Sequence, residues 1–221
     1  LGTHWVYNPS KLARIFPEGI QGFSDPVSDF HPNRKAGSFT HYGDQTWFLH
    51  ESIRKRETFT HEGWRSDWRE AMEDYDGYVD QAMKQTLANN GERPSDSNDL
   101  AGAARIGPIL DLDWDQAKTI KAARQQTQLT HGAPEVADAA EFFVRSVFAV
   151  RSGLGMMDAF TSAQVEGQYT RLEVGGALIQ AMHADSRDYV ATAKRFGLTC
   201  HTPEAFPLTL YFALRDANDW W

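Results

Sequence analysis

The chain has 221 residues and a formal net charge of −8, with 30 acidic and 22 basic side chains. This balance argues against a nucleic-acid-binding surface, because phosphate contacts require clustered Lys and Arg. The hydrophobic fraction of 41% and the charged fraction of 24% are typical of a globular protein. The only basic cluster, at residues 54–56, closes a predicted helix, where positive charge suits the helix dipole.

Cysteine content and hydropathy bear on the compartment. Cys200 is the only cysteine, so neither an internal disulfide nor a thiolate metal cage can form within the chain. No apolar run approaches the roughly 20 residues that a membrane-spanning helix needs, and no signal-peptide pattern opens the sequence. We therefore expect a cytoplasmic protein without a membrane partner. Because the chain begins at Leu1 and ends on Trp221 directly after a predicted helix, we also expect the native chain to be longer.

Helical periodicity dominates the sequence, and strand-like alternation is nearly absent. The clearest case is residues 134–150, where apolar side chains recur at steps of three and four, and where Glu135, Asp138, Glu141 and Arg145 are predicted to face solvent. Similar patterns predict helices over residues 44–55, 61–75, 77–90, 100–110, 115–129, 156–165, 171–183, 187–196 and 203–216.

The connections between these helices are mostly short, which indicates an all-α bundle with antiparallel neighbours. Two segments interrupt the pattern, residues 17–38 and 90–99, and loops of that length inside a compact domain tend to be binding loops or disordered. No repeat or shift of composition marks a boundary, so residues 1–221 are predicted to form a single all-α domain.

A polar run, Tyr-Gly-Asp-Gln-Thr at residues 42–46, leads into the apolar-periodic segment that follows it. Asp44 has a structural reason to lie there, since unpaired amide groups and the positive end of the dipole stabilise a carboxylate at a helix N-terminus. Four further segments belong to the same comparison, at residues 1–7, 99–108, 129–131 and 199–207. In their order along the chain, the five segments resemble the ADP-ribosylglycohydrolase family, in which a Thr-Asp-Asp-Thr run opens a helix at the position of residues 43–46.

The resemblance implies an all-α fold around a central cleft that holds a pair of Mg²⁺ ions. In the family these ions orient the ribose of an ADP-ribosyl group and activate a water that cleaves its glycosidic bond, so the implied partner is an ADP-ribosylated protein or a small ADP-ribose derivative. Carried onto this chain, the resemblance assigns residues to three roles: catalysis to Asp44 and Gln45, metal binding to Asp44 and Thr46, and substrate binding to His41, Tyr42, Arg105 and His131.

The chain departs from the family pattern where the charge matters most. Gly43 replaces the first Thr and Gln45 replaces the second Asp, while the family's N-terminal start and its C-terminal Asp-x-Asp-Thr run are missing from residues 1–221. Two Mg²⁺ ions carry four positive charges, and Asp44 is the one carboxylate at the matched positions. A single weak metal or a metal-free polar pocket is therefore expected, and a non-catalytic relative with a nucleotide-like ligand or a structural, crystallin-like role is the alternative hypothesis.

Several of these residues also have ordinary structural interpretations. His41 and Tyr42 could line the cleft or could belong to a capped helix start with a packed aromatic ring. His131 follows a predicted helix, where the dipole favours an imidazole.

Arg105 lies in a helix of small residues that permits close packing or close approach of a ligand. A guanidinium is rarely buried without an anionic partner. The candidates are Asp99 or Asp111 for a structural ion pair, and a diphosphate for a functional one.

Overall fold

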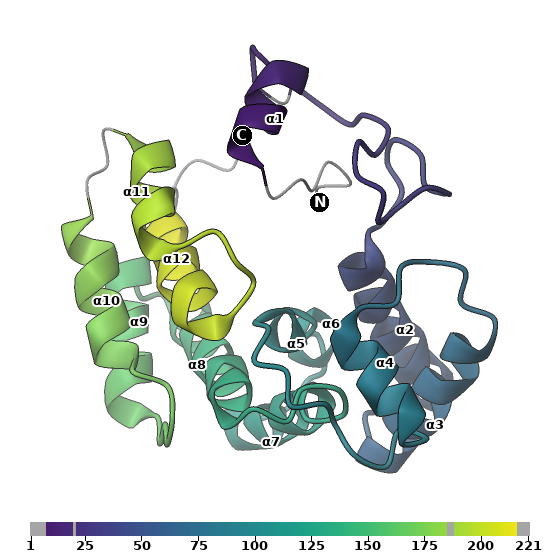
Figure 1. Ribbon diagram of the computed structural model, residues 1–221. Helices are drawn as coiled ribbons and strands as arrows, with labels where there is room; N and C mark the ends of the chain where they lie inside the picture. Colours follow the sequence, from purple (N-terminus) through teal and green to yellow (C-terminus); the bar gives the residue numbers. More distant parts are fainter. Residues whose placement is uncertain (1–7, 20, 185–187, 216–221) are drawn as a thin grey trace.

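A computed structural model describes residues 8–19, 21–184 and 188–215, and within these ranges the chain is helical with no strand (Figure 1). Two isolated β-bridges, Ser95 with His131 and Asp99 with His201, join loops rather than form a sheet. The predicted all-α fold is therefore confirmed. No helix in the described part of the chain is long and apolar enough to cross a membrane. The helices are α1 (Pro9–Ile15), α2 (His41–Arg56), α3 (His61–Glu73), α4 (Gln81–Ala88), α5 (Ala101–Ala104), α6 (Gly107–Leu110), α7 (Gln116–Thr127), α8 (Pro134–Arg151), α9 (Met156–Glu166), α10 (Val174–His183), α11 (Tyr189–Phe196) and α12 (Thr202–Arg215).

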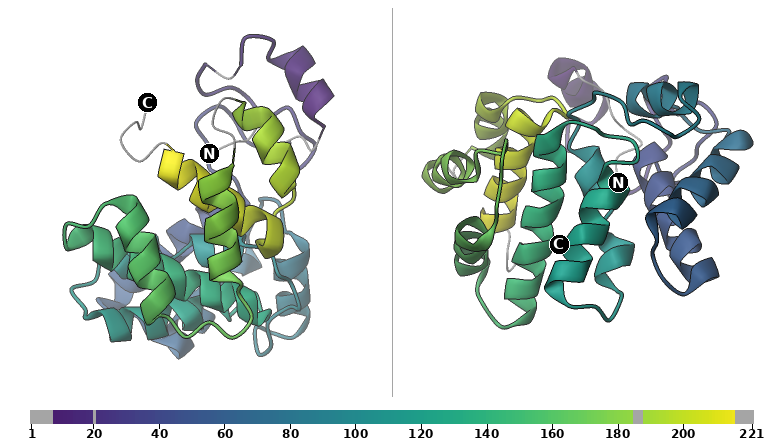
Figure 2. Two further views of the ribbon diagram at one scale, coloured as in Figure 1. Left: turned by 90° about the vertical axis from the view of Figure 1, so that its left-hand side faces the viewer. Right: turned by 90° about the horizontal axis from the view of Figure 1, so that it is seen from below.

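The helices form two groups that α7 and α8 connect (Figures 1 and 2). One group contains α2, α3 and α4, and the other contains α9 to α12. Each group has its own cluster of buried apolar side chains. The two clusters meet on α7, where Ala122 belongs to the first and the adjacent Ala123 to the second.

Helix α8 is buried on more sides than its sequence predicts, since it packs against both α7 and α9. Asp138 is fully buried and Glu141 nearly so, which contradicts the expectation that both face solvent. The carboxylate of Asp138 lies 2.7 Å from a guanidinium nitrogen of Arg124, and that of Glu141 lies 2.8 Å from Arg124 and from Arg145. Ion pairs between helices thus allow charged residues to occupy a buried face.

Other differences from prediction concern helix ends. Helix α2 begins at His41 rather than at residue 44, after the N-cap Thr40. Helix α4 begins only at Gln81, since Asp80 caps it by accepting a hydrogen bond from the Met83 amide at 2.7 Å. The first part of the predicted helix over residues 77–90 is therefore a loop.

The predicted helix over residues 100–110 is interrupted. It consists of α5 and α6, with Arg105 as the C-cap of α5. Pro108 lies in the first turn of α6 and has no amide hydrogen to continue the ladder of α5. Helix α1, at residues 9–15, was not predicted, while residues 21–38 contain no helix, as expected.

Candidate functional site

The first turn of α2 brings Asp44 close to two side chains from distant loops. Oδ2 of Asp44 lies 2.9 Å from Nη2 of Arg34 and accepts a hydrogen bond of 2.7 Å from the Tyr75 hydroxyl. The same Arg34 nitrogen lies 3.5 Å from Oδ1 of Asp76. Burial and the contact with Asp44 raise the pKa of Tyr75, so its phenol stays protonated and acts as a donor. Asp44 is therefore held by a cation and a neutral donor.

The donors that the resemblance assigns to Mg²⁺ do not converge. Asp44 is ion-paired with Arg34. The Thr46 hydroxyl donates to the Tyr42 carbonyl of its own helix at 2.9 Å, and the Gln45 amide is buried. Over the described ranges, no three His, Cys, Asp or Glu side chains are close enough to share a metal. Because Mg²⁺ prefers several carboxylate or water oxygens at about 2.0–2.1 Å, this set of residues does not fit the ion.

Gln45 belongs instead to a buried chain of hydrogen bonds. Its Oε1 accepts from Trp68 Nε1 at 2.6 Å and from Arg105 Nη1 at 3.5 Å. Arg105 Nη2 donates to the Thr130 hydroxyl at 2.6 Å, and that oxygen lies 2.8 Å from Nδ1 of His131. Four elements of the fold are connected through these side chains.

Arg105 and His131 are both almost fully buried. In the described part of the chain neither Asp99 nor Asp111, the two candidates for a structural ion pair, lies within ion-pair distance of Arg105, although the charges of Asp80 and Asp99 act on it from farther away. Burial lowers the pKa of Arg105 to about 10 and that of His131 to about 3, so the guanidinium keeps its charge and the imidazole is neutral at pH 7. The His131 ring lies against Gly102, where a Cβ would come within 2.7 Å of it. The small residues of α5 thus accommodate this histidine.

His41 is the first residue of α2 and lies among rings and one carboxylate. Its ring centroid is 3.9 Å from that of Tyr42, 5.1 Å from that of Tyr78 and 5.6 Å from that of His31, and its Nε2 lies 3.6 Å from Oδ2 of Asp80. Burial, reinforced by His31, lowers the pKa of His41 to about 3. Burial also raises the pKa of Asp80. The N-cap Thr40 makes no side-chain capping hydrogen bond, and the start of α2 is an aromatic and imidazole cluster in which His41 is buried.

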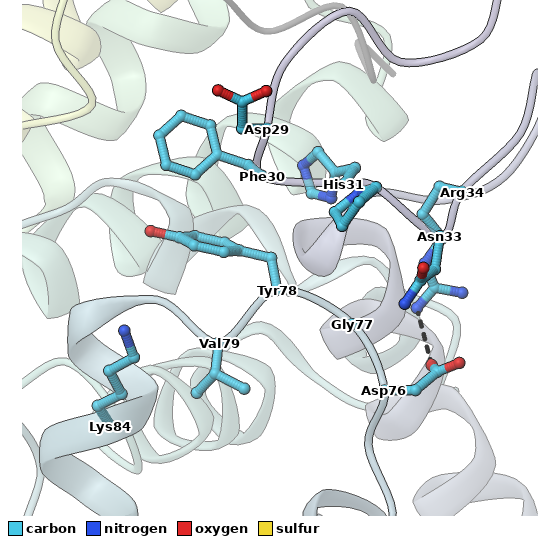
Figure 3. Close-up of a pocket in the computed structure, with 11 residues that line it drawn as sticks. Asp29, Phe30, His31, Asn33, Arg34, Asp76, Gly77, Tyr78, Val79 and Lys84 are labelled. Carbon is cyan, nitrogen blue, oxygen red and sulfur yellow. Dashed lines mark ion pairs between the residues drawn. The ribbon is translucent and has the colours of Figure 1, made fainter.

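A pocket of about 320 Å³ opens beside this cluster (Figure 3). One wall comes from the loop before α2 and the other from the loop before α4. Phe30 and Tyr78 meet edge to face, with their ring centroids 4.9 Å apart, and Figure 3 shows Lys84 on the same side of the pocket as Tyr78 and Val79. The side chains lining the pocket are those of residues 29–34, 76–79 and Lys84.

The pocket combines apolar rings with cations. Arg34 contributes a guanidinium that is 23% exposed, and Lys84 is exposed, with no ion pair to any residue in the described ranges. Asp29 and Asp76 lie at its edge. Aromatic side chains with a few polar groups are typical of small-molecule sites.

The sequence indicated some residues around this pocket as candidate site residues, but not the residues that line it. His41 and Asp44 contact pocket residues, His41 through His31 and Tyr78, and Asp44 through Arg34. The pocket residues of the two loops were not singled out. One signal was available, since residues 17–38 were identified as a possible binding loop; residues 77–80 were assigned to a helix.

The fold and the site thus define an all-α protein with a polar and aromatic pocket near the N-terminus of a helix. The family model of the ADP-ribosylglycohydrolases matches residues 1–221, the whole sequence. The chain therefore belongs to the ADP-ribosylglycohydrolase family, a family of hydrolases. No curated protein and no solved structure is significantly similar to it.

Proposed function

We propose that this protein binds the ADP-ribosyl group of a conjugate and hydrolyses its glycosidic bond. The observation that carries the proposal is the family match over residues 1–221. The substrate would be an ADP-ribosylated protein or a small ADP-ribose derivative, linked through nitrogen or oxygen.

The pocket beside α2 supports the binding part of the proposal. An adenine ring needs an apolar, aromatic wall, and Phe30, Tyr78 and Val79 supply one. A diphosphate needs cations, and Lys84 is the lining residue whose ammonium group has no carboxylate partner within the described ranges. Asp44, whose side chain is 13% exposed, lies next to this pocket and would flank the ribose, whereas the buried His41 would support Tyr78 and His31 from behind.

The test is release of ADP-ribose from peptides that carry it on a nitrogen or on an oxygen, followed by chromatography. Lys84→Ala and Tyr78→Ala should each weaken ADP-ribose binding by about tenfold, the loss of roughly one charge-assisted hydrogen bond or one ring contact. Lys121→Ala, at an exposed position of α7, is the matched control and should bind as the natural sequence does. Unchanged affinity in both pocket variants would place the ligand elsewhere.

One observation favours a second candidate, a relative that binds ADP-ribose without cleaving it. Asp44, the carboxylate at the matched motif position, is ion-paired with Arg34, and Gln45 is engaged with Trp68 in the interior. Calorimetric titration with ADP-ribose, with and without Mg²⁺, separates the two candidates when combined with the hydrolysis assay. Metal-independent binding without product supports the second candidate, whereas product release that is lost in Asp44→Ala supports the first.

We also propose that the protein acts in the cytoplasm. A lone cysteine, Cys200, is compatible with a reducing compartment but does not require one. Fractionation of cells that express the native gene tests this localisation.

A further inference from the structure

The guanidinium of Arg34 occupies the position next to Asp44 that a bound cation would take. A single nitrogen of its guanidinium is 2.9 Å from Oδ2 of Asp44 and 3.5 Å from Oδ1 of Asp76. These two carboxylates come from α2 and from the loop before α4, and the charge between them is supplied by a side chain from a third segment, the loop before α2. Figure 3 shows the Arg34 side chain directed toward Asp76.

The loop before α4 has room for this arrangement because residue 77 is glycine. A Cβ at Gly77 would lie 2.8 Å from Nη2 of Arg34 and would also collide with the Tyr75 hydroxyl group. The backbone thus leaves space for the two side chains that both contact Oδ2 of Asp44. The ion pair is also sheltered, since the side chains of Arg34 and Asp44 are 23% and 13% exposed.

We propose that Arg34 is the resident cation of the Asp44 site and takes the place of the divalent metal that the family motif implies. A metal ion at Asp44 would share a carboxylate whose Oδ2 already accepts from Arg34 and Tyr75, and it would have to approach a fixed positive charge. Removing the guanidinium leaves Asp44 and Asp76, whose side chain is 77% exposed, without the charge that both carboxylates contact. That pair of carboxylates is what a hard divalent cation prefers.

The proposal concerns cation binding by the protein alone and does not depend on the hydrolase activity, so either can fail without the other. The experiment is a titration with Mn²⁺, followed by electron paramagnetic resonance, and with Mg²⁺, followed by calorimetry. The natural sequence should show no saturable binding at millimolar metal. Arg34→Gln should bind the metal saturably, at least about tenfold more tightly than the detection limit set by the natural sequence, since ligand charge sets the affinity of such sites. Arg34→Gln combined with Asp44→Asn should lose this gain.

Lys35→Gln is the matched control, because Lys35 is an exposed neighbour whose ammonium group pairs, among the described residues, with Asp25 alone. It should behave as the natural sequence does. Saturable metal binding by the natural sequence that Asp44→Asn abolishes would overturn the proposal. So would an Arg34→Gln variant that is folded by circular dichroism and gains no affinity. If Arg34→Gln does not fold, the titration of the natural sequence and of Asp44→Asn still decides the question.

Discussion

The indole nitrogen of Trp68 donates a hydrogen bond of 2.6 Å to the amide oxygen of Gln45, and both side chains are buried. In the family motif that residues 43–46 resemble, an Asp occupies the position of Gln45. Here the amide joins α2 to α3 and, through the longer contact with Arg105, to the end of α5. A neutral side chain suits this position because it accepts from two donors without burying a negative charge.

Gln45→Ala should destabilise the fold by about 2–4 kcal/mol, because it leaves the Trp68 indole without its acceptor and opens a small cavity. Urea unfolding followed by tryptophan fluorescence measures the change. Gln180→Ala, on the exposed surface of α10, should change stability by less than about 0.5 kcal/mol. A Gln45→Ala variant with unchanged stability and no hydrolysis would instead make Gln45 a catalytic residue.

The hydroxyl of Thr130 connects the buried guanidinium of Arg105 to the buried imidazole of His131. Replacing Thr130 with Val removes this hydroxyl and nearly preserves the shape of the side chain. Thr130→Val should cost about 2 kcal/mol, since Arg105 then loses its short hydrogen bond inside the protein. Thr130→Ser keeps the oxygen and should recover most of the loss. Thermal unfolding of the two variants side by side checks this, and equal melting temperatures would show that the hydroxyl is dispensable.

Asp138 fixes the connection between α9 and α10 from inside the protein. Its Oδ2 accepts from the amides of Thr170 and Arg171 at 2.9 Å each, while Oδ1 pairs with Arg124 at 2.7 Å. Asp138→Ala should therefore cost about 3–5 kcal/mol, because it leaves Arg124 with less of its counter-charge. Asp138→Asn should cost less, since the amide oxygen still accepts. Asp158→Ala, exposed on α9, is the control, and a loss of similar size there would contradict the role of burial.

The sequence predicted the extent of helices α3 and α8 to within two residues, because apolar side chains recur at helical steps in both. Helix α3 ends two residues before its predicted end, and α8 extends one residue beyond its own. The periodicity failed to predict which side chains are buried where contacts between helices decide the burial. Asp138 lies on the predicted polar face of α8, but the packing of α7 supplies Arg124 as its partner, and no local pattern encodes that pairing.

The site was predictable only in part for the same reason. The motif at residues 42–46 and four further segments indicated the family correctly, because such motifs are runs of consecutive residues, although α2 begins three residues before its predicted start. The neighbours of Asp44 come from positions 10 and 31 residues away. Arg34 and Tyr75 lie in or next to loops, whose placement follows from how the helices pack. Charge counting along the sequence could predict a weak metal site, but it could not show that an arginine lies there.

Stability should fall as the pH is lowered from about 7.5 to about 5.5, chiefly because of two buried histidines, His41 and His131; burial also lowers the pKa of His31, which acts in the same direction. Burial, with the nearby His31, lowers the pKa of His41 from 6.5 to about 3, and burial with Arg105 does the same for His131. Both rings stay neutral in the folded protein across this window, whereas in the unfolded chain they bind protons below pH 6.5. Because the unfolded state then holds more protons, each histidine contributes a slope approaching about 1.4 kcal/mol per pH unit, and together they should cost about 3 kcal/mol over the window.

Two carboxylates also contribute, with opposite signs. The raised pKa of Asp80 makes the folded state bind a proton more readily, which offsets part of the loss, whereas the pKa of Asp67, lowered to about 2 chiefly by Arg56, adds to the loss as pH falls below about 4. Urea unfolding at the two pH values measures the effect. His131→Gln should remove about half of the difference, and His50→Gln, at a half-exposed position, should leave it unchanged. Equal stability of the natural sequence at both pH values would mean that the two rings take up protons in the folded state, which requires solvent to reach His41 and His131.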